Sequence, residues 1–280
     1  MATTITETSV ASQRTDTGIT RKRLLDNERV KETRLLLERI ALQAGAKVNF
    51  NLPAKSFAWL QMLEGEATFT AYHTDRISDT FSVLLPPGFP ATLTTVKGAS
   101  LIYAEIADAV PLDPGFLNHP PLFQVMDWMR EPVFVCEYDA RKRVSLVNPT
   151  ICGSIAVRVD MVIYPAGSVA PKYQHVGADA FMYVVSGRGA GITNGGSFPA
   201  QQGDVIHFPD REWHYLKSAN DTEIRFLEFC VPGEFKTVWA DPSKTSAWQS
   251  THRDLRNRET AQDEKERLVY QHWFGSPLRR

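Results

Sequence analysis

The sequence is poor in cysteine, contains no long apolar run and carries almost no net charge. Its three cysteines are scattered and form no C-x-x-C pair, so we expect buried thiols in a reducing, cytoplasmic environment and no disulfide framework. No apolar run reaches about 18 residues, which excludes a transmembrane helix, and residues 1–18 lack the apolar core of a secretory signal. The 31 basic and 32 acidic residues balance, which argues against nucleic acid or an anionic membrane as a partner.

Composition divides the chain into five segments. The apolar share of 43% is enough for one large core or two ordinary ones. Residues 1–33, which begin with a Thr- and Ser-rich stretch, are expected to be a disordered arm. Short apolar runs fill 34–108 and 132–232, and the Pro-rich stretch 109–131 between them is expected to be a linker. Residues 233–280 form a C-terminal extension that we expect to be partly helical.

Both central segments have the pattern of β-strands. In the first, apolar runs such as Phe57–Leu63 and Phe81–Leu85 are broken by turn residues at the spacing of a β-sandwich or barrel. In the second, a strongly apolar set alternates with a mixed set from Val157 to Tyr164, which indicates a strand with one apolar face. The stretch Ile224–Cys230 has the same period of two.

The C-terminal extension contains the one helix that the pattern predicts. Arg253–Phe274 is charged and free of Gly and Pro, as expected for a surface helix. Its apolar end, Leu268–Phe274, could pack on its own barrel, or serve as a dimer contact or a lid.

The two central segments resemble each other. Met62–Ala67 parallels Val185–Ala190, and Leu85–Ala91 parallels Phe208–His214. This weak internal repeat predicts two copies of one structural module.

The most informative stretch runs from Gly167 to Asn220. It resembles the two-part signature of the cupin family, in which Gly, His-x-His, Glu and Gly are followed after a short loop by Gly, Pro and His. Six residues occupy signature positions: Gly167, His175, Gly187, Gly203, Pro209 and His214. The resemblance implies an all-β fold of two tandem cupin barrels, also called double-stranded β-helices or jelly rolls, with a helical C-terminal tail.

The remaining signature positions depart from the family. Tyr173 stands at the first His position, and a phenol is a poor metal ligand unless a metal lowers its pKa. The Glu position falls on Ala180 by the longer spacing of the signature and on Asp179 by the shorter. Counting back from Gly187 and strand alternation both favour Ala180, whereas a β-bulge would bring Asp179 to the site.

Family members with a full signature bind a divalent metal through three His and one Glu inside the barrel. The resemblance therefore implies a metal site at His175, His214 and Asp179, with Tyr173 and the two imidazoles as catalytic groups. The third ligand stays open between Asp179, Tyr173, Gln174 and His207. The ion would be a divalent transition metal, Fe(II) foremost, with Mn, Ni and Zn as alternatives, and a metal-free pocket stays open as well.

Four further residues are candidates for a substrate pocket. Gln174 and His207 lie on the signature strands, and His207 could equally be a hydrogen-bonded barrel histidine. Trp213 could line the mouth or pack on the barrel. The fork of Arg158 could bind a substrate carboxylate, although a surface pair with Asp160 is the simpler interpretation.

The first barrel carries no ligands at the matching positions. No His occurs in 51–56, and Ala91 stands where the second part of the signature has its His. We therefore expect this barrel to provide packing or an interface, with Phe57, Trp59 and Phe69 in the core or at a dimer contact.

Three functions follow from the resemblance. The first, and leading, function is a metal-dependent oxygenase or dioxygenase that acts on an oxygen-chelating substrate in small-molecule or secondary metabolism. The second is a metal-independent isomerase, epimerase or cyclase, in which His214 would act as base and Tyr173 as acid. The third is a ligand-binding barrel without turnover. A homodimer is the default assembly, because closed two-fold dimers are the commonest oligomers.

Overall fold

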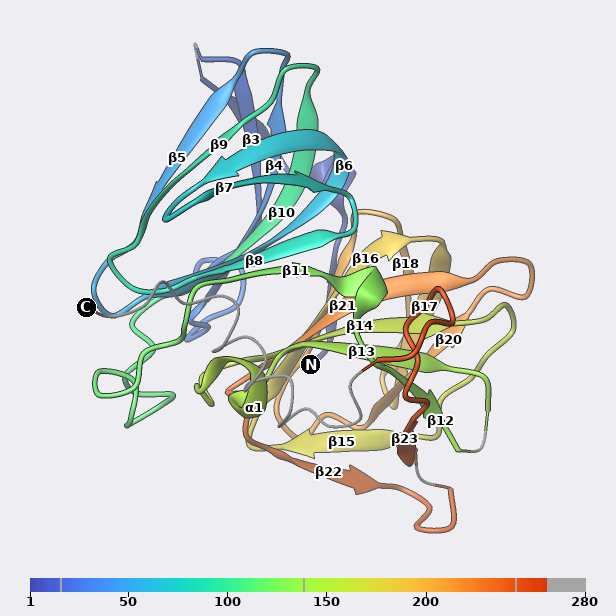
Figure 1. Cartoon of the computed structure of the whole chain (residues 1–280). Helices are drawn as coiled ribbons and strands as arrows, with labels where there is room; N and C mark the ends of the chain where they lie inside the picture. Colours follow the sequence, from blue (N-terminus) through green and yellow to red (C-terminus); the bar gives the residue numbers. More distant parts are fainter. Residues whose placement is uncertain (16, 138, 245, 261–280) are drawn as a thin grey trace.

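The computed structural model describes residues 1–15, 17–137, 139–244 and 246–260 and is almost entirely β structure. Figure 1 shows two β-barrels, the first built from β3 to β10 and the second from β12 to β23. The all-β fold of two tandem barrels predicted from the sequence is confirmed. Its three helical pieces in the described residues are single turns: η1 (Glu7–Ser9), η2 (Trp128–Arg130) and α1 (Pro149–Cys152).

The first barrel is one continuous strand system in which the long strand β6 bends and pairs on both sides. The sheet order is β11-β8-β6-β10-β4-β3-β2, and β5, β7 and β9 complete the barrel through β6. The strands are β2 (Ser12–Arg14), β3 (Ile19–Leu25), β4 (Leu35–Leu42), β5 (Lys47–Asn51), β6 (Phe57–Thr70), β7 (Thr74–Ser78), β8 (Phe81–Leu85), β9 (Pro90–Thr94), β10 (Ala99–Ile106) and β11 (Gln124–Asp127).

The second barrel consists of two sheets that face each other. The larger has the order β1-β19-β16-β21-β14-β13-β12-β23, and the smaller the order β18-β17-β20-β15-β22. The strands are β1 (Thr3–Ile5), β12 (Val133–Cys136), β13 (Lys142–Val147), β14 (Arg158–Tyr164), β15 (Tyr173–Val176), β16 (Asp179–Ser186), β17 (Arg188–Thr193), β18 (Gly196–Gln201), β19 (Val205–Phe208), β20 (His214–Ser218), β21 (Ile224–Val231), β22 (Lys236–Trp239) and β23 (Trp248–Ser250).

The interiors of the two barrels differ in chemistry. The first contains mainly hydrocarbon and aromatic rings, and Phe50 stacks on Tyr103 with centroids 5.6 Å apart. The buried carboxylate of Glu38 is already paired with Arg21 and Arg23, and His73 lies outside the core and pairs with Asp75 at 2.9 Å. In the second barrel, two buried imidazoles each have a nitrogen without a hydrogen-bond partner among the described residues, so the candidate site belongs to the second barrel.

The large sheets of the two barrels pack against each other. One buried cluster joins Leu37, Trp59 and Ile102 of the first barrel to Met161 and Phe229 of the second, and the rings of Trp59 and Phe229 meet edge to face at 5.7 Å. The apolar set predicted on β14 is the side that faces this interface. Because residues alternate along a strand, the mixed set of β14 faces the interior of the second barrel.

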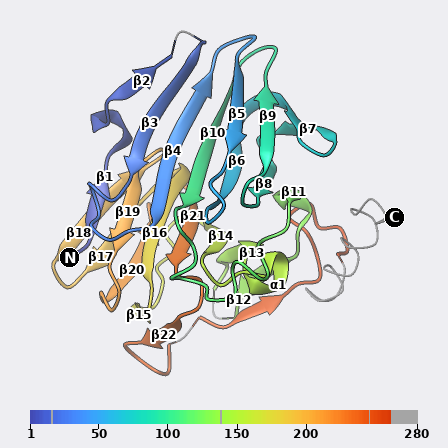
Figure 2. The same cartoon turned by 90° about the vertical axis from the view of Figure 1, so that its left-hand side faces the viewer.

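The N-terminal arm is ordered, contrary to the expectation of disorder for residues 1–33. Strand β1 pairs with β19 of the second barrel, whereas β2 and β3 extend the sheet of the first, so the arm connects the two barrels (Figure 2). The polar sequence of the arm does not reveal these strands, because an edge strand needs only one apolar side and backbone hydrogen bonds.

Glu7 anchors the arm at the crossing between the barrels. Its carboxylate pairs with Lys22 and Arg39, each at 3.1 Å, and its backbone N–H donates to Asp204 at 3.0 Å. The turn at Gly203 (φ 93°) has no room for a side chain, because a Cβ there would collide with the Glu7 carboxylate. Asp204 lies in this turn, where it accepts from the Gln201 N–H, and it holds the arm as well.

Two other boundaries differ from the sequence prediction. The linker 109–131 contains β11, which pairs with β8 and so belongs to the sheet of the first barrel, followed by η2. In the extension, β22 and β23 add edge strands to the second barrel. Residues 253–260, the start of the predicted helix, form turns and a bridge, and the remainder of that helix lies outside the described residues.

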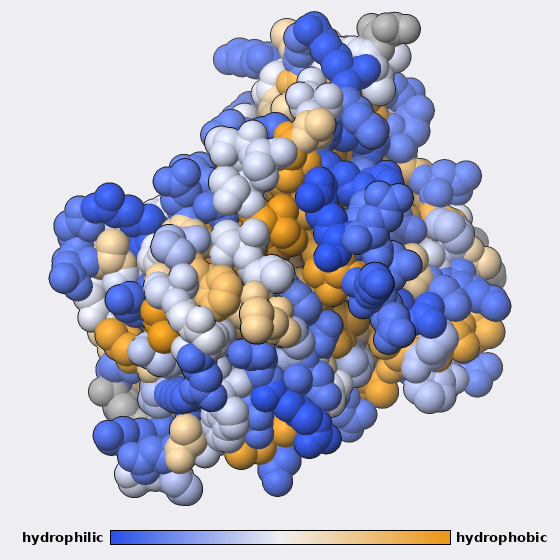
Figure 3. Space-filling view, turned by 180° about the vertical axis from the view of Figure 1, so that it is seen from behind, coloured by the Kyte–Doolittle hydropathy of each residue, from blue (hydrophilic) through white to orange (hydrophobic). Residues whose placement is uncertain are grey.

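The surface in Figure 3 is mostly hydrophilic, with hydrophobic side chains grouped toward its middle. Large exposed apolar side chains of the described residues are widely separated in sequence: Met1, Tyr72, Val96, Leu117, Leu122 and Val169. No helix in the described ranges has the length and apolar character that would let it cross a membrane. The homodimer expected from the sequence stays a prediction.

Removing the charge of Glu7 should destabilise the fold. We expect Glu7→Gln to lower the free energy of unfolding by about 2 kcal/mol, because the partly buried Arg39 loses its partner. The matched control is Glu66→Gln, because Glu66 pairs with Arg76 at 3.0 Å on the surface. This substitution should lower the free energy of unfolding by about 0.5 kcal/mol or less. Urea unfolding measures both, and equal effects would contradict an anchoring role for Glu7.

Candidate functional site

Three aromatic side chains named from the sequence converge inside the second barrel. Tyr173 and His175 lie on β15, and His214 lies on β20 directly opposite Tyr173 in the antiparallel ladder. The Tyr173 ring centroid is 4.5 Å from that of His214 and 5.1 Å from that of His175, and the two imidazole centroids are 5.7 Å apart. The structure therefore brings together two short motifs that are far apart in the chain.

Packing and a tight turn set the orientation of the two imidazoles. His214 stacks on Phe208 with centroids 4.0 Å apart, and Phe235 meets His175 edge to face at 4.4 Å. The turn that leads into β20 places Arg211 in the left-handed region (φ 62°), and its N–H donates to the His175 carbonyl at 2.8 Å. This hydrogen bond ties the His214 turn to the His175 strand.

Each imidazole has one nitrogen occupied and one without a partner. Nδ1 of His214 is 2.7 Å from the Glu212 carbonyl, so Nδ1–H donates there and Nε2 carries the lone pair. Nδ1 of His175 is 3.3 Å from the Thr237 hydroxyl. Both Nε2 atoms are buried without a hydrogen-bond partner among the described residues. Such an atom is expensive to leave unpaired, and a backbone-bonded Nδ1 with a vacant Nε2 is the arrangement of a metal-binding histidine.

Burial sets the protonation of the site. It lowers the pKa of His214 to about 3, the nearby His175 acts in the same direction, and the hydrogen bond to Glu212 opposes both. His214 is therefore neutral at pH 7. Burial also raises the pKa of Tyr173 well above its usual value, and the Glu228 carboxylate adds to this effect, so Tyr173 remains a phenol.

The sequence analysis missed two donors, both on β21. Across the β16–β21 ladder, Cys230 lies opposite Ala180 and Glu228 lies opposite Met182. Glu228 Oε1 is 3.9 Å from Nε2 of His175. A His175 ring nitrogen, a Glu228 carboxylate oxygen and Cys230 Sγ lie within 4.8 Å of one another. The period of two in Ile224–Cys230 puts Glu228 and Cys230 on one face, and this signal could have found them.

Asp179 does not reach the imidazoles, which corrects its assignment as the third metal ligand. Its carboxylate lies 3.2 Å from Nε2 of His207 and accepts from the Asp210 N–H at 2.7 Å. Ala180, its neighbour on β16, faces the barrel, so alternation turns Asp179 away. The register shift of β16 occurs only between Val184 and Ser186, too far along the strand to rotate Asp179 inward.

His207 and Gln174 are also directed away from the site. His207 stacks on Phe181 with centroids 4.7 Å apart, and Phe181 belongs to the cluster between the barrels. The hydrogen-bonded histidine foreseen as the alternative is therefore the correct interpretation of His207. Gln174 lies between Tyr173 and His175 on β15, and alternation places it on the opposite face of the strand.

Arg158 lies on the barrel side of β14, where it pairs with an acid. In the ladder it is opposite Cys230, and its Nε donates to Asp160 at 2.8 Å. Asp160 also accepts from the Ser145 hydroxyl at 2.8 Å. The attraction of Asp160 raises the pKa of Arg158, against the effect of burial. Trp213 is half-buried in the turn before β20.

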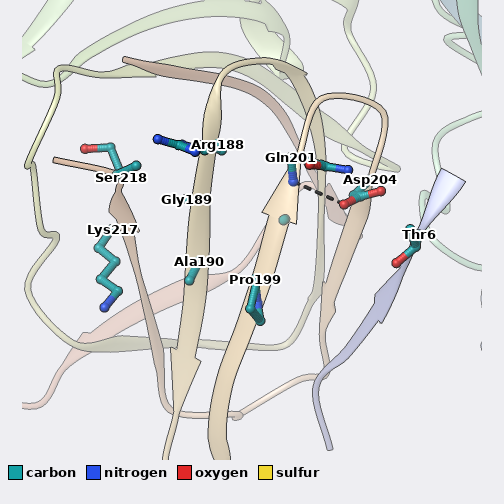
Figure 4. Close-up of a pocket in the computed structure, with 11 residues that line it drawn as sticks. Thr6, Arg188, Gly189, Ala190, Pro199, Gln201, Asp204, Lys217 and Ser218 are labelled. Atoms are coloured by element: carbon teal, nitrogen blue, oxygen red, sulfur yellow. Dashed lines mark hydrogen bonds between the residues drawn. The ribbon is translucent and has the colours of Figure 1, made fainter. Parts of the chain in front are cut away.

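A separate hollow of about 470 Å³ opens on the outer side of the second barrel (Figure 4). Its lining comes from β17, β18 and β20 together with Thr6, and includes none of the imidazoles. Two of its charged groups already have partners: Asp204 accepts from the Gln201 N–H at 3.1 Å, and Arg188 pairs with Asp221. Because the unpaired donors lie inside the barrel, we place the candidate site there.

Known proteins support this fold. Residues 160–230 match the family model described as "Cupin domain". This matched stretch contains Tyr173, His175, His214, Glu228 and Cys230, so every residue that converges in the barrel lies within it.

Solved structures extend the likeness to both barrels. A mutant of Bacillus subtilis oxalate decarboxylase OxdC is 16% identical, with a TM-score of 0.67, and the match covers 85% of this chain and 79% of that chain. Two further oxalate decarboxylase structures, each 15% identical with the same coverage, concern its substrate binding mode (TM-score 0.68) and the Mn(II) centres of the Bacillus subtilis enzyme (TM-score 0.67). At this identity the likeness is one of fold. No curated protein matches the sequence.

The buried His214 should make stability depend on pH. Its folded pKa of about 3 lies below the unfolded value of about 6.5, so between these values only the unfolded chain gains a proton. The resulting stability is complete above about pH 6.5 and is lost as the pH falls toward 3. In metal-free protein, we expect a loss of about 2 kcal/mol between about pH 7.5 and pH 5 that His214→Gln does not share. Urea unfolding at the two pH values measures it, and equal losses would contradict the buried neutral imidazole.

Proposed function

We propose that this chain is a metal-dependent enzyme that converts a small molecule inside its C-terminal barrel. One observation carries the proposal: Nε2 of His175 and Nε2 of His214 are both buried and unpartnered among the described residues, in rings whose centroids are 5.7 Å apart. A carboxylate oxygen of Glu228 lies 3.9 Å from the first of these nitrogens. Two imidazole lone pairs in neighbouring rings, with a negative charge close to one of them, suit a divalent cation.

The residues present fit a divalent transition metal. His214 is neutral with its lone pair on Nε2, so no proton has to leave before it binds. Both Nδ1 atoms are engaged by neighbouring groups, which holds each ring in orientation. A bound ion would act as a Lewis acid toward the oxygens of a substrate and leave coordination positions open for them. The Mn(II) centres reported for the structurally similar oxalate decarboxylase support such an ion.

Within this class we propose an oxygenase with Fe(II) as the ion, and Mn(II), Ni(II) and Zn(II) as alternatives. A substrate with two adjacent oxygens would be cleaved at a C–C bond, and both atoms of O2 would enter the products. Tyr173 stays protonated and lies beside both imidazoles. Its hydroxyl would donate a hydrogen bond to a substrate oxygen and orient it. Oxygen uptake with a panel of catechols and enediols tests the reaction class.

The acid–base alternative has support of its own. Tyr173 is a protonated phenol next to the unprotonated Nε2 of His214, which is the arrangement an isomerase or cyclase needs. A pKa of about 3, however, makes His214 a weak base at neutral pH, and this favours its role as a ligand. Turnover that persists in strong chelator and is lost in His214→Ala would select the alternative. Ligand binding without turnover would select the non-catalytic barrel.

Metal content is the direct test. After loading with Fe(II), Mn(II) or Zn(II), we expect the wild-type protein to retain about one ion per chain, and His175→Ala and His214→Ala to retain far less, because each removes one donor. Asp179→Asn should retain the wild-type amount, since Asp179 pairs with His207 on the other face of β16. Elemental analysis after gel filtration measures retention. A wild-type protein that holds none of these ions would refute the proposal.

A further inference from the structure

In this chain the signature position that carries the carboxylate in the cupin family has no metal-binding group. Ala180, which occupies that position by strict counting, is buried in the interior of the second barrel. A methyl group has no donor atom, so β16 contributes no ligand at this point.

The neighbouring strand β21 carries two donors on the same face. Cys230 lies directly opposite Ala180, and Glu228 lies opposite Met182 on the same face. Paired residues of an antiparallel ladder have Cβ atoms about 4.5–5.5 Å apart. A donor on β21 can therefore reach nearly the same point as a carboxylate at position 180 would.

The separations of these donors are compatible with a shared ion. His175, Glu228 and Cys230 have ligand atoms within 4.8 Å of one another, and the closest reported approach is 3.9 Å between Nε2 and Oε1. Zn–N bonds of about 2.0–2.1 Å and Zn–S bonds of about 2.3 Å put tetrahedral donors roughly 3.4–3.6 Å apart. The three groups would need to approach by up to about an ångström, through small side-chain movements of all three residues, to bind one ion.

The polar groups next to these donors are already hydrogen-bonded to other residues. Asp160, which lies opposite Glu228 on β14, is bound by Arg158 and Ser145, each at 2.8 Å. Nε2 of His175, by contrast, is buried without a partner among the described residues. The vacant nitrogen beside an acid and a thiol points to a cation as the missing partner.

We propose that Glu228 and Cys230 of β21 replace the missing carboxylate and form a metal site with His175. His214 lies outside this group of three, with its ring centroid 5.7 Å from that of His175, and would join as a second imidazole only after moving closer. This inference rests on the proposed metal function and specifies its ligands. A site with one thiolate, one carboxylate and imidazoles is softer than the His and Glu set of the full signature. It should therefore hold Zn(II), Co(II) or Fe(II) in preference to Mn(II).

Cobalt provides a spectroscopic test of the thiolate. Full-length protein loaded with Co(II) should show sulfur-to-cobalt charge-transfer absorption in the near ultraviolet. Cys230→Ser should lose this band, whereas Cys136→Ser and Cys152→Ser should keep it, because these two buried thiols are not part of the donor group. A wild-type Co(II) complex without the band, or a band that survives in Cys230→Ser, would overturn the role of Cys230.

Metal affinity tests the carboxylate. We expect Glu228→Gln to lower affinity for Co(II) at least about 10–100-fold, the loss that even outer partners of a metal site produce, while Asp179→Asn remains at the wild-type value. Adding Ala180→Glu to Glu228→Gln should restore affinity, because both positions face the same space. Titration monitored by the visible cobalt bands measures each value, with far-ultraviolet circular dichroism as the check on folding.

The outcomes separate this inference from the proposed function. Wild-type protein that binds no metal refutes both. Wild-type protein that binds metal, with Glu228→Gln equal to it, overturns only the ligand assignment. A folded double variant that stays at the affinity of Glu228→Gln overturns the claim that Glu228 replaces the carboxylate of position 180. If Glu228→Gln itself fails to fold, the cobalt band of the wild type and its loss in Cys230→Ser decide the assignment.

Discussion

The central constraint on this molecule is that the large sheet of the second barrel is buried on both faces. One face packs on the first barrel through contacts such as Trp59 against Phe229, and the other lines the interior of its own barrel. Every polar group on that inner face must find a partner inside the protein. Asp160 finds Arg158 and Ser145. His175 and His214 lie opposite that inner face, on the smaller sheet, and their Nε2 atoms have no hydrogen-bond partner among the described residues. The functional proposal rests on these two nitrogens.

The same constraint explains how a degenerate signature can keep a working site. In an antiparallel barrel, neighbouring strands direct their side chains to common points, so a donor lost from one strand can be supplied by the strand beside it. Ala180 lies opposite Cys230 and Met182 lies opposite Glu228, which is the pairing that the proposed exchange of ligands requires. A comparison of signatures along one strand cannot detect this exchange, because the ladder that connects the two positions is formed only in the folded chain.

The errors of the sequence prediction have physical causes. Residues 1–33 look disordered because an edge strand is held by backbone hydrogen bonds and by contacts such as Glu7 with Arg39, which do not require an apolar pattern. Arg158 looks like a surface residue because a charged side chain on a mixed face usually meets water. Here that face turns into the barrel. Asp179 was a candidate ligand only if a bulge rotated it, and the irregularity of β16 lies farther along the strand.

The sequence by itself determined the all-β class, the two modules, and the spacing that places Tyr173, His175 and His214 on strand positions of the C-terminal barrel, because alternation and turn residues are local properties. Only the tertiary structure decided which face of each strand is inside and which strand lies next to β16. Those choices depend on register between segments far apart in the chain, since a shift of one residue turns every side chain to the other face. For that reason only the folded structure places Glu228 and Cys230 at the candidate site, and it places Asp179 and His207 outside the site.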